Sequence, residues 1–222
     1  MERILFRFTK GEPVRHVGHL DLMRVVERAM RRARFPVAYS EGFNPRPRMA
    51  FASALTLGAT SQYELCQLDL AEEVGEDRLN EAVSALRAQM PAGITVEEVW
   101  AVPLEKRSPY IQAVAAEYRL TLAGEDAADR TQRFLSENPE RFSHPYRVEA
   151  QPDEAWLTIR LPVGERGGVR IRDVVAELEQ ALPGIEVTRL CRTRLWCERE
   201  PGPELQVRAR ENGPTALPHE RV

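Results

Sequence analysis

The sequence is poor in cysteine and has no long apolar run. Its 222 residues include three cysteines, with no Cys-x-x-Cys pair and no three-cysteine cluster, which disfavours a zinc or iron–sulfur site and fits a reducing compartment. The apolar runs are far too short to span a bilayer, and the first residues have no signal-peptide pattern. We therefore expect a cytoplasmic protein with no membrane partner and no cofactor or metal on this chain.

The sequence motifs of common nucleotide and hydrolase sites are also missing. It contains no P-loop, no dinucleotide-binding fingerprint and no nucleophile elbow. One glycine-rich segment, residues 164–168, precedes an expected helix, and its backbone amides could meet an anion. A mobile loop is the simpler explanation of that segment.

Charge is unevenly distributed along the chain. The net charge is −3, yet residues 1–48 hold 11 Lys+Arg against 5 Asp+Glu, which makes that segment +6 and the remaining 174 residues −9. A positive segment in an acidic protein favours a confined anionic partner over a nonspecific nucleic-acid coat. Because 29 of the 31 basic residues are arginine, the preference for arginine alone says little about bidentate recognition.

Hydrophobic periodicity predicts the same order of elements twice. The first half reads as strands 3–9, 37–53 (broken by a loop at 42–48), 63–70 and 94–102 with helices 18–34 and 76–90. The second half reads as strands 117–122, 146–150, 155–161 and 185–197 with helices 127–137 and 171–182. Each half has the order βαββαβ. We predict an α+β fold of two tandem ferredoxin-like units with antiparallel sheets.

Domain boundaries follow from composition. We expect an N-terminal unit over residues 1–103, a linker at 104–115 and a C-terminal unit over 116–199. Residues 200–222 hold several prolines and no apolar periodicity, which predicts a disordered tail.

Residues 39–48 form the most informative segment, which the pattern places between the second and third strands. Gly42, Pro45 and Pro47 exclude a regular helix or a central strand. A rigid turn that presents guanidinium groups beside aromatic rings suits a phosphate-bearing or nucleotide ligand. The alternative is a structural hairpin with solvated arginines. The candidate RNA- or substrate-binding residues here are Tyr39, Phe43, Asn44, Arg46 and Arg48.

A row of arginines lies on the first predicted helix. Arg24, Arg28 and Arg31 share one helical face, where Glu27 partly balances them. The row is either a solvated face or a continuation of the positive surface of the loop. In the second case, binding would depend strongly on salt.

His19 and Asp21 are the candidate catalytic residues. A histidine beside a carboxylate can act as a general base in phosphoryl chemistry. At a helix start, however, Asp21 is more simply a partner of the helix dipole. A metal site from His16, His19 and Asp21 would need further ligands from elsewhere, and we predict none.

The segments Gly18-His-Leu-Asp-Leu-Met-Arg24, Pro36-Val-Ala-Tyr-Ser40, Gly42-Phe-Asn-Pro45 and Leu57-Gly58 resemble the bacterial radical-SAM-linked family. Its members occur beside, or fused to, an uncharacterised radical SAM protein. The resemblance is specific over residues 3–70 and loose up to about 200, and many relatives have histidine and lysine at the positions of Arg46 and Arg48. It implies a radical SAM partner that holds SAM and an iron–sulfur cluster, and it supplies no catalytic residue.

Three functions remain open. The first is an accessory or substrate-recognition protein for a radical SAM enzyme, which binds tRNA, rRNA or another anionic substrate. The second is an RNA-processing or RNA-modifying enzyme that uses His19 and Asp21, since the predicted architecture is similar to that of the repeat-associated CRISPR RNA-processing proteins. The third is a structural or assembly protein.

Overall fold

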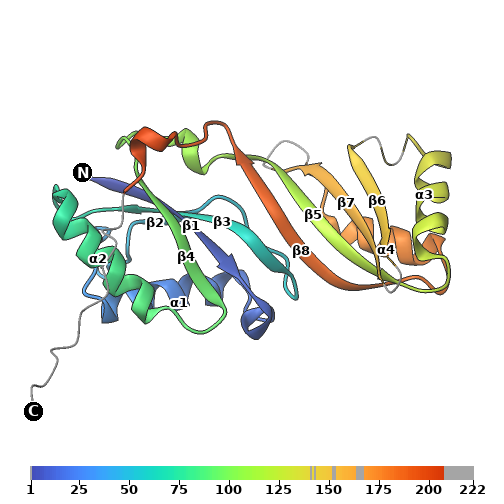
Figure 1. The fold of residues 1–222 in the computed structure, drawn as a ribbon. Coiled ribbons are helices and arrows are strands. Elements are labelled where there is room, and N and C mark those ends of the chain that lie inside the picture. The colour runs from blue at the N-terminus through green and yellow to red at the C-terminus, as the bar shows by residue number, and fades with distance from the viewer. Residues whose placement is uncertain (1, 141, 143, 152–153, 164–167, 208–222) are drawn as a thin grey trace, which may run out of the picture.

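The chain consists of two halves, and the strands and helices follow the same order in each (Figure 1). This computed structural model describes residues 2–140, 142, 144–151, 154–163 and 168–207. The first half contains β1 (Arg3–Lys10), α1 (His19–Arg32), β2 (Met49–Phe51), β3 (Thr60–Asp69), α2 (Glu76–Gln89) and β4 (Ile94–Ala101). The second half contains β5 (Ala113–Ala123), α3 (Ala127–Glu137), β6 (Tyr146–Gln151), β7 (Glu154–Pro162), α4 (Ile171–Ala181) and β8 (Glu186–Cys197). Short 3-10 helices are η1 (Glu12–Val14), η2 (Pro109–Ile111) and η3 (Pro203–Leu205).

All eight strands belong to one mixed sheet. The strand order is β4-β1-β3-β8-β5-β7-β6, and β2 pairs with β3 beside this path. Every pairing is antiparallel except that of β3 with β8, which is parallel and aligns Thr60 with Cys191 and Ser61 with Arg192. Within each half the strands pair antiparallel, as expected, but the two halves form one mixed sheet and not two separate ones. Because β2 covers only the Cys66–Leu68 end of β3, the other end of that edge is free to pair with β8.

The helices pack on the sheet because each has an apolar stripe. In α1, Leu22, Val26 and Met30 are buried at helical spacing, and they join Phe6 and Phe8 of β1 in one core. The helix α2 adds to the same core, which also holds buried residues of β3 and β4. The helices α3 and α4 pack on a second core with buried residues of β5, β7 and β8. A third, smaller cluster lies around Leu5, Leu65 and Trp100.

The 39–48 segment lies between α1 and β2, not between the second and third strands as expected. Of the predicted second strand, the structure retains β2 and two isolated bridges, which pair Val37 with Leu70 and Tyr39 with Pro47. Gly42, with a φ of 118°, and the two prolines that follow it prevent a continuous strand.

The predicted disordered tail is wrong for its first part. Residues 200–207 contain η3 and return to β4, where Gln206 bridges Trp100 and the Val207 N–H donates to the Val99 carbonyl over 2.8 Å. Residues 208–222 lie outside the described residues. In the expected linker, Tyr110 and Ile111 are buried, and β5 begins at Ala113. The division into domains stays a prediction. Across the described ranges, none of the helices has the length and apolar character needed to cross a membrane.

Candidate functional site

The 39–48 loop projects from the sheet on a hydrogen-bonded base, called here the neck, which is formed by residues 38–40 and 46–48. The Ser40 N–H donates to the Arg46 carbonyl over 2.8 Å, and the Arg46 N–H donates to Ser40 Oγ over 3.0 Å. Below them, the Arg48 N–H donates to the Ala38 carbonyl, and the Arg48 carbonyl accepts from the Asp69 N–H at the end of β3. The backbone of the neck therefore continues the hydrogen bonding of the sheet, which limits how far the loop can move.

The tip of this loop presents an aromatic ring to solvent, and its neck presents two cations. Phe43 is fully exposed, with a relative accessibility of 106%, and Tyr39 is exposed by 41%. Asn44, Arg46 and Arg48 are exposed as well. Within the described residues, neither guanidinium group makes a hydrogen bond or an ion pair. Burying a Phe side chain in a partner contributes about 1.5–3 kcal/mol, so burial of Phe43 could stabilise a complex by about this amount.

The arginine row of α1 is largely neutralised. Arg24 pairs with Asp21 over 2.9 Å, and Arg31 pairs with Glu27 over 2.8 Å. Arg28 is exposed and has no partner among the described residues. In the part of the chain that the structure describes, no hydrogen bond or ion pair joins this row to the 39–48 loop. Of the eleven basic residues in 1–48, four have side chains without a hydrogen bond or ion pair to a described residue: Arg28, Arg34, Arg46 and Arg48.

The structure does not bring His19 and Asp21 together. The Asp21 carboxylate is exposed and accepts from Arg24, whereas the His19 ring packs edge-on against Phe51 at 5.5 Å between centroids. His19 Nδ1 is buried and has no hydrogen-bond partner among the described residues. Burial, and secondarily the charge of Arg192, lowers the pKa of His19. Among the same residues, no group of three or more His, Cys, Asp or Glu side chains could hold a metal ion.

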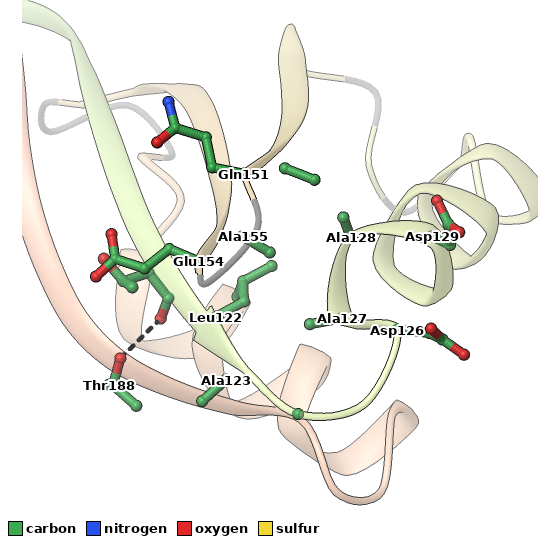
Figure 2. A pocket seen from close by; sticks show the side chains of 13 residues that line it. Leu122, Ala123, Asp126, Ala127, Ala128, Asp129, Gln151, Glu154, Ala155 and Thr188 are labelled. Atoms are coloured by element: carbon green, nitrogen blue, oxygen red, sulfur yellow. Dashed lines mark hydrogen bonds between the residues drawn. The ribbon is translucent and has the colours of Figure 1, made fainter.

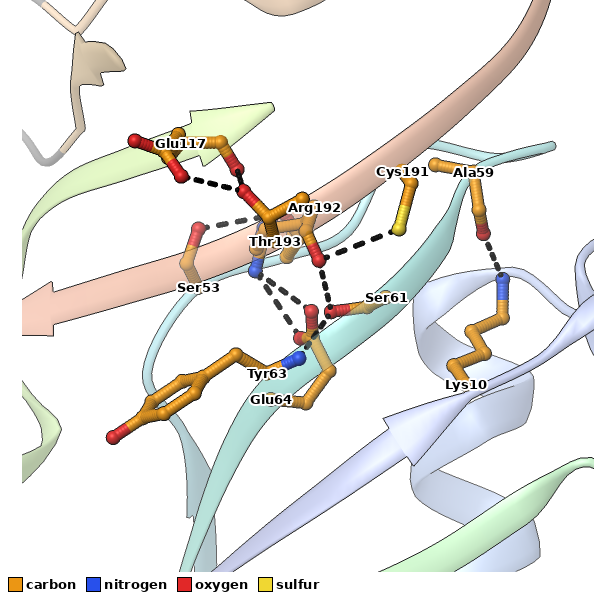
Figure 3. A network of polar contacts seen from close by, with 11 residues as sticks. Lys10, Ser53, Ala59, Ser61, Tyr63, Glu64, Glu117, Cys191, Arg192 and Thr193 are labelled. Atoms are coloured by element: carbon orange, nitrogen blue, oxygen red, sulfur yellow. Dashed lines mark hydrogen bonds and ion pairs between the residues drawn. The ribbon is translucent and has the colours of Figure 1, made fainter. Parts of the chain in front are cut away.

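A buried charge network joins the two halves, and no sequence pattern indicated it. Arg192 of β8 is fully buried, and its Nη1 donates to both oxygens of Glu64 of β3 at 3.1 Å (Figure 3). Its Nη2 donates to the Ala54 carbonyl over 2.8 Å. Lys10, also buried, donates to the Ala59 and Arg15 carbonyls.

The pKa values of this network reflect its burial. Burial raises the pKa of Glu64, while Arg192 and Lys10 oppose that shift, and burial lowers the pKa of Lys10. Perturbed pKa values often mark active sites. Here, however, the ion-paired side chains of Arg192 and Glu64 are 0% and 2% exposed, so no substrate reaches them. We assign the network a structural role at the β3–β8 junction.

The three thiols are poor candidates for a nucleophile. Burial raises the pKa of Cys66 and of Cys191, and burial together with two neighbouring glutamates raises the pKa of Cys197 to about 12. All three are therefore protonated near neutral pH, and the thiolate is the reactive form.

A hollow of about 530 Å³ lies in the second half, between the start of α3, the ends of β5 and β6, and the start of β7 (Figure 2). Asp126 and Asp129 line its helical side, and Glu154 lies near Thr188 on the strand side. These three carboxyl groups make the hollow a poor site for an anionic ligand.

Residues 3–194 match a family described as uncharacterised proteins conserved in bacteria (DUF2344), so the chain belongs to this family. No curated protein matches it. Similar solved structures include the archaeal box H/ACA sRNP Nop10–Cbf5 complex, at 11% identity and a TM-score of 0.41, with 85% of this chain and 47% of that one covered.

Two further solved structures are similar to this chain at low sequence identity. A Cbf5–Nop10–Gar1 complex has 11% identity and a TM-score of 0.42 over 86% of this chain and 48% of that one. An unknown protein from Galdieria sulphuraria has 10% identity and a TM-score of 0.27 over 88% and 98%. The chain spans about half the length of the Cbf5-complex chains that it matches.

Proposed function

We propose that this protein recognises RNA for a radical SAM enzyme and that the 39–48 loop makes the contact. The single observation that carries the proposal is the loop itself, in which a hydrogen-bonded neck holds Phe43, Arg46 and Arg48 out in solvent. A stacked base on Phe43 and phosphates on the two arginines would use all three side chains. In this proposal SAM and the iron–sulfur cluster belong to the partner enzyme.

The same proposal assigns each half of the chain to one ferredoxin-like unit. In the first half the strands lie in the order β4-β1-β3 with β2 on β3, and in the second half in the order β8-β5-β7-β6. The two orders correspond strand for strand, which supports the assignment. The loop then occupies the connection between the first helix and the second strand of the first unit.

An RNA-processing enzyme is the second candidate, and one observation favours it. The lowered pKa of His19 keeps its imidazole neutral near pH 7, as a general base must be. Against it, Asp21 is bound to Arg24 and does not orient the ring. The substitution His19→Ala should then abolish RNA turnover and leave binding intact. Equal cleavage by the variant would remove this candidate.

The test of the first candidate compares two sets of variants in fluorescence anisotropy with labelled tRNA and rRNA fragments. The loop variant carries Phe43→Ala, Arg46→Ala and Arg48→Ala. The control carries Arg133→Ala and Arg172→Ala, because both arginines are exposed on helices of the second half and have no ion pair among the described residues. Loss of two phosphate contacts should lower the slope of log affinity against log salt by about 1.5 in the loop variant only.

Two results would contradict the proposal. If wild-type protein shows no salt-dependent affinity for these RNAs, the RNA part fails. If affinity purification of the tagged chain from its native cells never recovers a radical SAM protein, the part that concerns the partner fails. Equal binding by the loop variant and the control would move the contact away from the loop.

A further inference from the structure

In the part of the chain that the structure describes, the α-helices of the second half, α3 and α4, pack on one face of its sheet. Arg160 of β7 lies between Ile159 and Leu161, which both belong to the core under α3 and α4, so its side chain points to the opposite face. The same alternation puts Arg194 and Trp196 of β8 on that face, because Leu195 between them belongs to the core. Figure 1 shows α4 on one side of these strands.

A ladder of arginines and aromatic rings crosses this face. The Arg7 guanidinium carbon lies 5.3 Å from the centre of the Tyr63 ring, and that of Arg194 lies 4.4 Å from the same ring. Arg194 also lies 5.9 Å from Trp196, and Arg160 lies 4.1 Å from Trp196. The ladder therefore runs from β1 through β3 and β8 to β7. Stacked rings hold the arginines in place, which reduces the entropy lost when they bind a ligand.

The charges of the face differ in whether they are paired, and the acidic Glu117 of β5 lies between Arg160 and Arg194 in the sheet register. Arg7 pairs with Glu98, and Arg194 pairs with Glu200, so these two cations are neutralised. The Arg160 side chain is exposed and makes no ion pair or hydrogen bond to a described residue.

Arg119 and Thr121 of β5 flank the core residue Leu120, so both point to this face, and Arg189 of β8 lies opposite Thr121. The side chains of Arg119 and Arg189 are exposed and unpaired within the described ranges.

Trp156 of β7 adds a free aromatic ring to the same face. Its neighbours Ala155 and Leu157 are buried in the helix-side core, so the indole points away from the helices. The ring is partly exposed and makes no ring–ring or cation–π contact with a described residue. The sheet-face surface is defined by these residues: Arg119, Arg160, Arg189, Trp156 and Trp196.

We propose that the sheet-face surface binds single-stranded RNA. Three unpaired guanidinium groups can neutralise phosphates, and bases can stack on Trp156 and on the outer plane of the Arg160 guanidinium. The strands β5 and β8, of 11 and 12 residues, are about 35 Å long or more, which gives room for several nucleotides. A duplex hides its base planes and cannot make the stacking contacts.

This surface shares no residue with the 39–48 loop, so the inference goes beyond the proposed function and stands or falls without it. The test measures anisotropy of a labelled 12-nucleotide RNA of mixed sequence, alone and annealed to its complement, over a range of salt. The sheet-face variant carries Arg119→Ala, Arg160→Ala and Arg189→Ala. The matched control carries Arg133→Ala, Arg170→Ala and Arg172→Ala, which remove the same charge from exposed positions in or next to α3 and α4.

The wild-type chain and the control should bind the single strand more tightly than the duplex. The sheet-face variant should lose about 2 from the slope of log affinity against log salt. The substitution Trp156→Ala should weaken binding about 5-fold or more, while Trp156→Phe, which keeps a ring, should lose less. Urea melts of each variant establish that it is folded.

Equal single-strand binding by the sheet-face variant and the control would overturn the inference, as would equal affinity of wild-type protein for strand and duplex. If only the loop variant loses affinity, the proposed function stands and this inference fails. If only the sheet-face variant loses affinity, this inference stands and the proposed role of the 39–48 loop fails.

Discussion

Removing one member of the Glu64–Arg192 ion pair should destabilise the protein severely. In Glu64→Leu the Arg192 guanidinium stays buried without its carboxylate, and in Arg192→Met the Glu64 carboxylate stays buried without its guanidinium. An uncompensated buried charge costs about 3–5 kcal/mol, a large part of a typical stability of about 5–15 kcal/mol.

The double variant Glu64→Leu with Arg192→Met should recover most of this loss, because no member of the pair then remains charged. The Ala54 carbonyl would still lose the bond that it accepts from Nη2, at a cost of about 1 kcal/mol. Urea unfolding of the four proteins, followed by far-UV circular dichroism, gives the coupling energy of the pair. We expect at least about 2 kcal/mol. If the loss in the double variant equals the sum of the single losses, the ion pair is not the source of the effect.

Three more predictions concern stability. Burial, with Arg192 second, lowers the pKa of His19, so the folded state binds this proton less well than the unfolded state does; stability should fall as pH drops from about 7.5 to 5, and His19→Phe should remove that slope in urea melts. If wild type and the His19→Phe variant lose stability equally as pH falls, this prediction is wrong. Gly124→Ala should cost clearly more than Gly42→Ala in the same assay: both glycines have left-handed φ, but only at Gly124 would the new Cβ overlap the Gly184 carbonyl, whereas the space around Gly42 is open. If the two variants lose equal stability, the predicted overlap with the Gly184 carbonyl is not the cause. Val207→Pro deletes the N–H donated to Val99, so it should lower the free energy of unfolding by about 1 kcal/mol or more, whereas Val207→Ala keeps that bond and should lose less.

Most helices and strands could be predicted because their periodicity comes from local geometry. The residues of α3 match the expected helix 127–137, and those of α1 and α2 lie within the expected helices. Such segments carry their apolar stripe in the sequence itself. The β3–β8 pairing could not be predicted in the same way, because it aligns only two residue pairs that are about 130 positions apart.

Three buried charged residues could not be predicted from the sequence either. Alternation treats a charged residue in a strand as exposed, yet Lys10, Glu64 and Arg192 lie in the interior. Glu64 and Arg192 pair with each other, and Lys10 and Arg192 donate to nearby carbonyls. Outward-pointing arginines, in contrast, can be predicted from strand alternation. Arg7 lies between two phenylalanines and Arg160 between isoleucine and leucine, so each should point away from the core. For the 39–48 loop, the composition indicated a rigid exposed turn, and the neck bonds supply the physical basis for it.

The link between β3 and β8 also has a consequence for how the chain folds during synthesis. Glu64 and Lys10 leave the ribosome long before Arg192, which follows Glu64 by 128 positions. Until β8 arrives, the Glu64 carboxylate has no guanidinium to accompany it into the interior and must stay hydrated, which keeps that edge of β3 open to water. We therefore expect the first half to stay incomplete until the final strand pairs with β3 in a late, long-range step.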